Sequence, residues 1–277
     1  MENAFARIGV VGVGLIGGSV ARAARAADRD VTIVGLDVDG VARVAEAAGV
    51  IDVAGDLDAI VACDLIVLAA PVSANLAWLD RLAATATHAL VTDVGGTKRQ
   101  MSAKAVELDG RVAFIGGHPM AGSERSGFAA AEAGLFTGRR WFVVPPPNSA
   151  AGHIARLKPW ISKLGAVPSV VDADTHDRVM AMVSALPQVT ASALMAVVGD
   201  RVGLEGLEMS GPGLRDTTRL AASAATWMVD GLAHNSREVA DAIDSLITEL
   251  RIVRDQLDTP ERAAELFARA QAWRRAL

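Results

Sequence analysis

Cysteine is almost missing from this sequence. Cys63 is the only one, so no disulfide can form within the chain. It lies in the apolar stretch VACDLIVLAA, which indicates a buried thiol in a reducing compartment, and we therefore expect a cytoplasmic protein. No group of cysteines and histidines has the spacing of metal ligands, so no metal is expected. Tyrosine is absent, and we attach no functional meaning to that absence.

Positive charge is scarce as well. The 27 Lys and Arg residues are outnumbered by 32 Asp and Glu residues, the formal net charge is −5, and the basic residues form no cluster. This balance argues against a nucleic-acid partner and favours a small-molecule ligand.

Long apolar runs and a leader sequence are also missing. The run LIVLAAPV is much shorter than the roughly 20 residues that a membrane-spanning helix needs. The first residues turn apolar without the charged region and cleavage site of a signal peptide. We expect neither a membrane segment nor a cleaved leader.

The chain divides into two halves of different pattern, and 277 residues are enough for two domains. Up to about residue 172, short β-branched runs alternate with Ala-rich helical segments, which is typical of a parallel sheet with crossover helices. These runs are RIGVVGV, VTIVGLD, LIVLAA, ALVTDV, VAFIGG, WFVVPP and PSVVDA. The sequence predicts an α/β fold: a Rossmann-type parallel sheet domain over residues 1–172, followed by an all-α domain over 173–277.

Several segments of the second half, such as REVADAIDSLITELRIVRDQL, have helical spacing. Some of these helices are apolar around much of their circumference, more than one sheet domain can cover. We therefore predict a homodimer that forms through the helical domain.

Residues 12–17 read GVGLIG and match the G-x-G-x-x-G fingerprint directly after a predicted strand. Gly12 permits a tight turn, Gly14 lets the backbone approach a pyrophosphate, and Gly17 allows close helix packing. Leu15 and Ile16 begin the helix, whose N–H groups and positive dipole end attract phosphate. A purely structural turn has the same letters, so the fingerprint alone is weak.

The end of the next strand supports a dinucleotide site. Asp37 follows the glycines by about 20 residues, where a carboxylate accepts hydrogen bonds from an adenosine ribose. Asp39 adds negative charge, and the nearest cation, Arg43, is interpreted as a solvated helix residue. A 2′-phosphate would be repelled, so NAD is predicted rather than NADP. Ala70 and Pro71, after the strand LIVLAA, are also assigned to the cofactor.

Six stretches carry a family resemblance. They are GVGLIGGS at 12–19, LAAPV at 68–72, TDVGGTK at 92–98, GGHPMAGSE at 116–124, SALPQ at 184–188 and LRDTTRLA at 214–221. With this combination the chain resembles the prephenate and arogenate dehydrogenases of tyrosine biosynthesis over nearly its whole length. The resemblance implies an NAD-binding domain, a helical dimerisation domain, and oxidative decarboxylation of a cyclohexadienyl carboxylate to an aromatic product.

His118 is the predicted general base. It lies in GGHPMAGSERSG, where the density of Gly and Pro predicts a shaped loop that closely approaches another group. As hydride leaves the ring carbon, its hydroxyl must lose a proton, and a histidine suits that role. The alternative is a histidine that only braces a turn.

The resemblance places the family's substrate-binding arginine at Arg219, and a guanidinium can bind a carboxylate through two hydrogen bonds. Arg215, one turn earlier, is interpreted as a salt-bridge residue. Gly96 stands where the family usually has a serine near the histidine, and Thr97 is the candidate for supplying that hydroxyl in catalysis. Gln188 replaces a second histidine and stays uncharged. Gly96 and Gln188, assigned to the substrate site, leave prephenate, arogenate and 4-amino-4-deoxyprephenate open as substrates.

The remaining candidates receive structural interpretations. We expect His88, His153 and His234 to have no partners, and His176 to cap or pack a helix. Asp93, at a strand end, either orients the loop backbone near the nicotinamide or only shapes a turn.

Two other functions stay open. A β-hydroxyacid dehydrogenase or imine reductase needs a catalytic Lys or Asp in the helices, but lysine is absent from residues 173–277. An inactive NAD-binding regulator would explain Gly96 and Gln188 as degeneration, whereas the presence of His118 and Arg219 argues against it.

Overall fold

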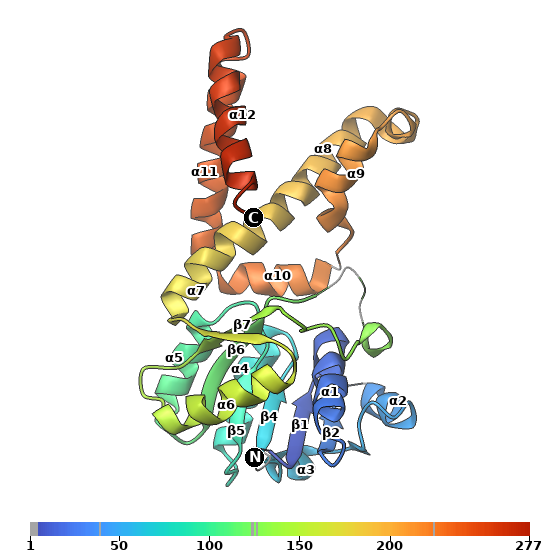
Figure 1. Ribbon diagram of the computed structural model, residues 1–277, viewed down its shortest axis with the longest axis vertical. Helices are drawn as coiled ribbons and strands as arrows, with labels where there is room; N and C mark the ends of the chain where they lie inside the picture. Colours follow the sequence, from blue (N-terminus) through green and yellow to red (C-terminus); the bar gives the residue numbers. More distant parts are fainter. Residues whose placement is uncertain (1–4, 39, 123–124, 126, 224) are drawn as a thin grey trace.

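The computed structural model describes residues 5–277 apart from 39, 123–124, 126 and 224. An eight-stranded sheet forms the centre of the N-terminal half, in the order β3-β2-β1-β4-β5-β6-β7-β8 (Figure 1). The strands are β1 (Arg7–Val11), β2 (Thr32–Leu36), β3 (Val53–Ala54), β4 (Leu65–Leu68), β5 (Leu90–Asp93), β6 (Ala113–Pro119), β7 (Arg140–Val144) and β8 (Val167–Val170).

The sheet departs from the predicted one in two places. β7 pairs with β6 in antiparallel fashion, whereas the other neighbours are parallel. The chain between these two strands has no described crossover helix beyond the 3₁₀ turn Phe128–Ala130, so it returns antiparallel. The short strand β3 was not predicted, because a two-residue strand has no sequence pattern of its own.

Two layers of helices cover the sheet. Residues of α1 (Leu15–Ala27), α2 (Val41–Ala47) and α6 (Ala151–Lys163) share one buried cluster with strand side chains. Residues of α3 (Leu57–Val61), α4 (Val72–Ala83) and α5 (Arg99–Glu107) share a second cluster with strand side chains that point the other way. In β4 the side chains alternate between the two clusters, so both faces are apolar and the strand reads as a continuous hydrophobic run.

The glycine turn after β1 is needed for the close approach of α1 to the sheet. Gly12 has φ +93°, and a Cβ there would lie 2.7 Å from the main chain of Ala69. A Cβ on Gly17 would lie 1.9 Å from Gly12 O. At Gly14, by contrast, a Cβ would meet nothing within 4 Å. Gly12 and Gly17 are therefore required by the fold, and Gly14 leaves space for a ligand.

The rest of the chain is helical. It contains α7 (Ala173–Met180), a π turn (Ala181–Ala185), α8 (Leu186–Glu208), α9 (Pro212–Thr218), a 3₁₀ turn (Arg219–Ala222), α10 (Ala225–His234), α11 (Ser236–Arg254) and α12 (Pro260–Arg274). α10 crosses above the sheet, while α7–α8 and α11–α12 project away from it (Figure 1). Only Ala181, Val239 and Ala242 form a buried apolar cluster among the described residues of this half.

The expectation that no apolar segment reaches membrane-spanning length is wrong for one helix. The helical segment Ala173–Glu208, which contains a π turn at Ala181–Ala185 and a kink at Gly203, is long and apolar enough by length and composition to span a membrane, and residues 179–199 hold no charge. Polar residues interrupt its apolar runs, which is why a search for unbroken runs missed it. Only 17% of its most apolar window is buried. A helix of this composition needs a partner for its exposed face.

Gly17→Ala tests the requirement for a close helix approach. Its Cβ meets a main-chain oxygen that cannot rotate away, so we expect the free energy of unfolding to fall by about 3 kcal/mol, the upper range for overpacking. Gly14→Ala is the matched control and should cost less than about 1 kcal/mol. Urea denaturation of the apoprotein measures both, and equal losses would contradict the assignment.

Candidate active site

A cavity of about 570 Å³ lies where the carboxyl ends of the central strands face the helical half. It brings together many of the residues selected from the sequence. Those that line it are Gly14, Leu15, Ile16, Ala70, Gly96, Thr97, His118, Gln188 and Arg219. Ligands of open α/β sheets bind at this end of the strands.

Four of the predicted cofactor residues support the cavity without lining it. Gly12 and Gly17 shape the turn, and Pro71 is the N-cap residue of α4. The Asp37 carboxylate accepts hydrogen bonds from the N–H of Val13 at 2.6 Å and from the N–H of Val38 at 2.7 Å. It therefore ties the end of β2 to the glycine turn. Asp39 lies outside the described residues.

His118 lies on strand β6, opposite Phe142 of β7, and not in a loop as the sequence predicted. The preceding glycine explains the difference. A Cβ on Gly117 would lie 2.4 Å from Asp93 O and 3.0 Å from Trp141 Nε1. The glycine therefore lets β6 pass close to the end of β5. The close approach that the glycines indicated is between two strands of this protein and not between a loop and a ligand.

A chain of hydrogen bonds holds the His118 ring. Its Nδ1 is 2.9 Å from His176 Nε2, and His176 Nδ1 is 2.8 Å from Asp177 Oδ1. Asp177 also accepts the main-chain N–H groups of Lys98 at 2.7 Å and Arg99 at 2.9 Å. We refer to His118, His176 and Asp177 as the relay.

The charge of Asp177 determines the tautomers in the relay. Burial acts to raise the pKa of Asp177, but the hydrogen bonds from His176, Arg99 and Lys98 outweigh it and hold the pKa below its usual value. The carboxylate then accepts a hydrogen bond from His176 Nδ1–H, and His176 Nε2 accepts a hydrogen bond from His118 Nδ1–H. This leaves an unprotonated His118 Nε2, the ring atom that faces Gly96 at the cavity.

His118 stays neutral in this setting. Burial, then repulsion from His176 whenever that ring is protonated, and then the Lys98 ammonium group lower the pKa of His118 well below 6.5. A neutral imidazole with a free Nε2 can accept a proton from a ligand at neutral pH.

A buried ion pair fixes the backbone around His118. Lys98 Nζ pairs with Asp93, and both side chains are fully buried. Asp93 also accepts the N–H groups of Gly95 at 2.9 Å and Gly117 at 3.0 Å. Of its two expected roles, the structure shows Asp93 bonded to the loop backbone that borders the cavity.

The polar residues of the opposite wall are differently placed. Gln188 Nε2 donates to Leu220 O at 2.7 Å, so Oε1 is the amide atom left for a ligand. Arg219 lines the cavity and forms no ion pair with any described residue. Arg215, expected in a salt bridge, is exposed and forms none within the described chain. Thr97 Oγ1 is buried without a partner among the residues that the structure describes, and no hydrogen bond joins it to His118.

Sequence reasoning missed the site roles of four residues, namely Lys98, His176, Asp177 and Asn235. Asn235 lines the cavity, and its Nδ2 donates to Asp177 O at 2.8 Å. Of the two roles expected for His176, capping is wrong, because Asp172 caps α7, whereas packing is confirmed, because the buried ring lies against the rings of His118 and Phe142. His234 also has a partner, since its Nδ1 is 2.6 Å from Gln100 Oε1. The adjacent His and Asp at the start of a helix, eight residues before SALPQ, were the available signal for the relay.

Two family models match the chain. The nucleotide-binding domain of prephenate dehydrogenase matches residues 20–170, and the dimerization domain of prephenate dehydrogenase matches residues 172–270. The chain belongs to the prephenate dehydrogenase family.

Individual relatives agree with the family assignment. A prephenate dehydrogenase of Bacillus subtilis is 32% identical over 93% of this chain and 71% of its own length. The structure of Aquifex aeolicus prephenate dehydrogenase with hydroxyphenyl propionate and NAD⁺ has a TM-score of 0.92 and 25% identity, covering 100% of this chain and 99% of that one. Synechocystis arogenate dehydrogenase has a TM-score of 0.79 and 26% identity, covering 98% and 100%.

The pH dependence of turnover follows from the state of His118. Because its pKa lies well below 6.5, His118 is unprotonated at neutral pH, and it loses the ability to accept a proton only as the pH falls through that lowered value. We expect kcat/KM for NADH formation to stay level between pH 8 and about 6.5 and to fall only in more acidic buffer. An acidic limb centred at or above pH 6.5 would contradict the geometry.

Asp177→Asn tests the relay. An amide can present N–H instead of an acceptor to His176, so the tautomers are no longer determined, and we expect kcat to fall by about 10²–10⁴-fold, the range for losing general-base catalysis. Asp174→Asn, on the same helix and paired with Arg99 at the surface, is the matched control and should keep full activity. Equal activities in steady-state assays of the two variants would refute the relay.

Proposed function

We propose that this chain catalyses the NAD-dependent oxidative decarboxylation of prephenate or a close analogue to a para-substituted aromatic product. One observation carries the proposal: a neutral His118, held from behind by the relay, faces the same cavity as the glycine turn and Arg219. This arrangement supplies a base, a place for a dinucleotide and a cation for a carboxylate.

The residues present fit NAD. The N-terminus of α1 has no side-chain cap and opens at Gly14, so its N–H groups are available to a pyrophosphate. Asp37 stands at the end of β2, where it can bind a ribose hydroxyl and repel a 2′-phosphate. Thr97 Oγ1 and Asn235 Oδ1 are buried polar atoms at the cavity that lack partners in the described chain.

The chain's own residues account for the remaining steps. When bound, NAD accepts hydride from the ring carbon that bears the hydroxyl. His118 Nε2 takes the hydroxyl proton, so the oxygen becomes carbonyl-like without developing full charge. The carboxylate on the opposite ring carbon leaves as CO₂, its bonding electrons complete the aromatic ring, and the oxygen, now a phenolate, takes back the proton from His118. Arg219 orients a substrate carboxylate through two hydrogen bonds.

Gln188 bears on which analogue is accepted. Its Nε2 is engaged by Leu220 O, so the free Oε1 presents an acceptor to the substrate. Arogenate carries an ammonium group, an N–H donor, on its side chain, whereas prephenate and 4-amino-4-deoxyprephenate carry there a pyruvyl group that offers only acceptors. We infer that arogenate is preferred over prephenate.

The alternatives have less support. The described lining of the cavity contains no lysine, which a lysine-dependent hydroxyacid dehydrogenase would require. An inactive regulator would have no use for a base whose tautomer is set by two further residues.

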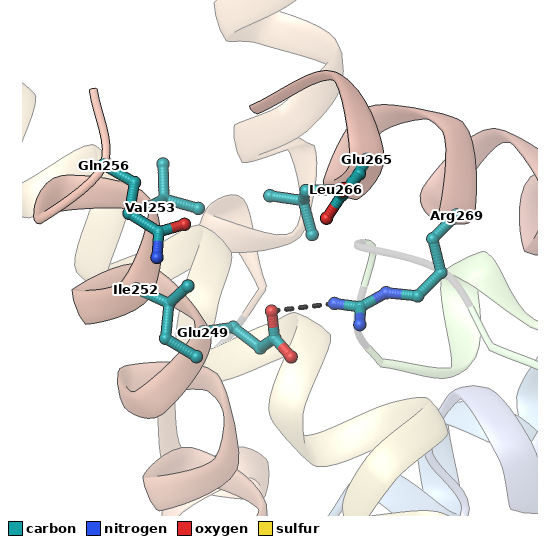
Figure 2. A pocket seen from close by; sticks show the side chains of 7 residues that line it. All are labelled: Glu249, Ile252, Val253, Gln256, Glu265, Leu266 and Arg269. Carbon is teal, nitrogen blue, oxygen red and sulfur yellow. Dashed lines mark hydrogen bonds and ion pairs between the residues drawn. The ribbon is translucent and has the colours of Figure 1, made fainter. Parts of the chain in front are cut away.

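We infer a cytoplasmic homodimer. Cys63 is a buried free thiol, and the second family model is a dimerization domain. Side chains such as Val197, Leu204, Phe267 and Trp273 are between 61% and 83% exposed in the single chain. Figure 2 shows a groove between α11 and α12 where Ile252 and Leu266 lie beside the Glu249–Arg269 ion pair. A second copy that covers these surfaces would account for them.

Activity is tested by NADH formation from NAD with prephenate, arogenate or 4-amino-4-deoxyprephenate, repeated with His118→Asn. We expect turnover of at least one substrate, with arogenate preferred over prephenate, and a loss of about 10²–10⁴-fold in the variant. Gln188→His should shift the ratio of kcat/KM toward prephenate. If NAD binds and no substrate turns over, the regulator is the better assignment.

The dimer is tested by sedimentation velocity with a matched pair of exposed valines. Val197→Glu on α8 (61% exposed) should weaken dimerisation at least tenfold, because it buries an unpaired charge at an interface. Val44→Glu on α2 (56% exposed) should leave it unchanged. A wild-type mass of 28.7 kDa, that of one chain, would contradict the dimer.

A further inference from the structure

Two buried polar atoms at the cavity form no hydrogen bond within the described chain. Thr97 Oγ1 and Asn235 Oδ1 are buried, lack hydrogen-bond partners, and belong to side chains that line the cavity. The two residues are only 6% and 5% exposed. An unsatisfied buried polar atom destabilises a fold by about 1–3 kcal/mol, so two at one site point to a ligand that satisfies them.

Both atoms are held in place by Asp177. Asn235 lies directly before α11, and its Nδ2 donates to Asp177 O at 2.8 Å. This bond fixes the amide, so Oδ1 is the atom without a partner. On the other side, Thr97 follows β5 and precedes Lys98, whose N–H donates to Asp177 Oδ1 at 2.7 Å. One carboxylate residue thus joins the sheet domain and the helical half at this point.

The chemistry of the two atoms matches a primary carboxamide. Asn235 Oδ1 can only accept a hydrogen bond, whereas the Thr97 hydroxyl can donate one. A carboxamide offers the complement, an N–H donor beside a carbonyl acceptor. Nicotinamide ends in this group, and the cavity wall near Thr97 is formed by Ala69, Ala70 and Gly95, which follow β4 and β5. The carboxyl ends of these strands are where an α/β sheet binds its ligand.

We propose that Asn235 Oδ1 accepts the carboxamide N–H of bound nicotinamide and that the Thr97 hydroxyl donates to the carboxamide oxygen. Together they fix the rotation of the ring and the face that it turns toward the substrate. Because Asn235 also binds the main chain of Asp177, the cofactor contact and the relay that carries His118 are held by one residue. The proposal rests on the proposed function only in requiring that NAD binds.

The first test leaves the protein unchanged. Calorimetric titration compares NAD, 3-acetylpyridine adenine dinucleotide, in which a methyl group replaces the carboxamide NH₂, and ADP-ribose, which has no ring. We expect wild-type protein to bind the acetylpyridine analogue about tenfold more weakly than NAD, the effect of one lost hydrogen bond in a buried site.

The second test removes each protein atom. Thr97→Val should lower the affinity for NAD about tenfold and leave the affinity for ADP-ribose unchanged. We expect this variant to fold, because the hydroxyl forms no hydrogen bond within the described chain. Asn235→Ala should bind NAD and the acetylpyridine analogue equally, and its affinity for ADP-ribose reports whether it folds. Thr87→Val is the matched control, since its hydroxyl donates to Val61 O at 2.9 Å away from the cavity, and NAD affinity should not change.

Four results would overturn the inference. Wild-type protein that binds NAD and the acetylpyridine analogue equally would show that no acceptor meets the N–H. Thr97→Val with unchanged NAD affinity but a raised KM for the carboxylate substrate would assign the hydroxyl to the substrate instead. Protein that binds neither NAD nor ADP-ribose would overturn the proposed function as well, whereas binding of both without discrimination overturns only this inference.

Discussion

The buried carboxylate of Asp177 is the interaction on which the active site depends. The carboxylate accepts hydrogen bonds from the ring N–H of His176 and from the main-chain N–H groups of Lys98 and Arg99 at the start of α5. The main-chain carbonyl of Asp177 accepts a hydrogen bond from the side-chain amide of Asn235. The sheet domain and the helical half therefore meet at this residue, as they also do where the Val72 N–H donates to Asp230, and His118, the proposed base, lies at the meeting point that Asp177 forms. Such an arrangement needs a low-dielectric setting, because water would compete for each of these hydrogen bonds and would let the imidazoles rotate.

A second buried charge pair performs a different task. The Lys98–Asp93 pair is completely enclosed, and burial of two charges brings little net stability. Its value lies in position: Asp93 draws the backbones of Gly95 and Gly117 together, so the loop after β5 and the strand that carries His118 have fixed spacing. The ammonium group also discourages protonation of His118. Stability that the pair does not supply is provided by the two apolar layers on either side of the sheet.

The features that depend on local pattern could be predicted from the sequence. The glycine turn, the position of Asp37 directly after β2 and the long strands each follow from residues close together in the chain. The relay could not be predicted, because His118 and His176 are 58 positions apart and a single histidine on a helix has no distinctive spacing. The same limit applies to Asn235, whose partner is also 58 positions away. Placing His118 in a loop failed for a different reason: glycine density indicates a close backbone approach, and here the neighbour is another strand.

The departures at Gly96 and Gln188 acquire a physical meaning once the relay is known. A serine at position 96 would stand near His118 Nε2, since even a Cβ there would come within 3.9 Å of that atom. Its absence does not release the ring, because His118 is held from behind through Nδ1. The base can therefore keep its orientation while the wall facing the substrate changes. Gln188 is likewise bonded to the backbone of the opposite wall and not to the relay. In the function proposed here, substrate choice and proton transfer therefore rest on separate sets of hydrogen bonds, so the wall that contacts the substrate can change without disturbing the relay.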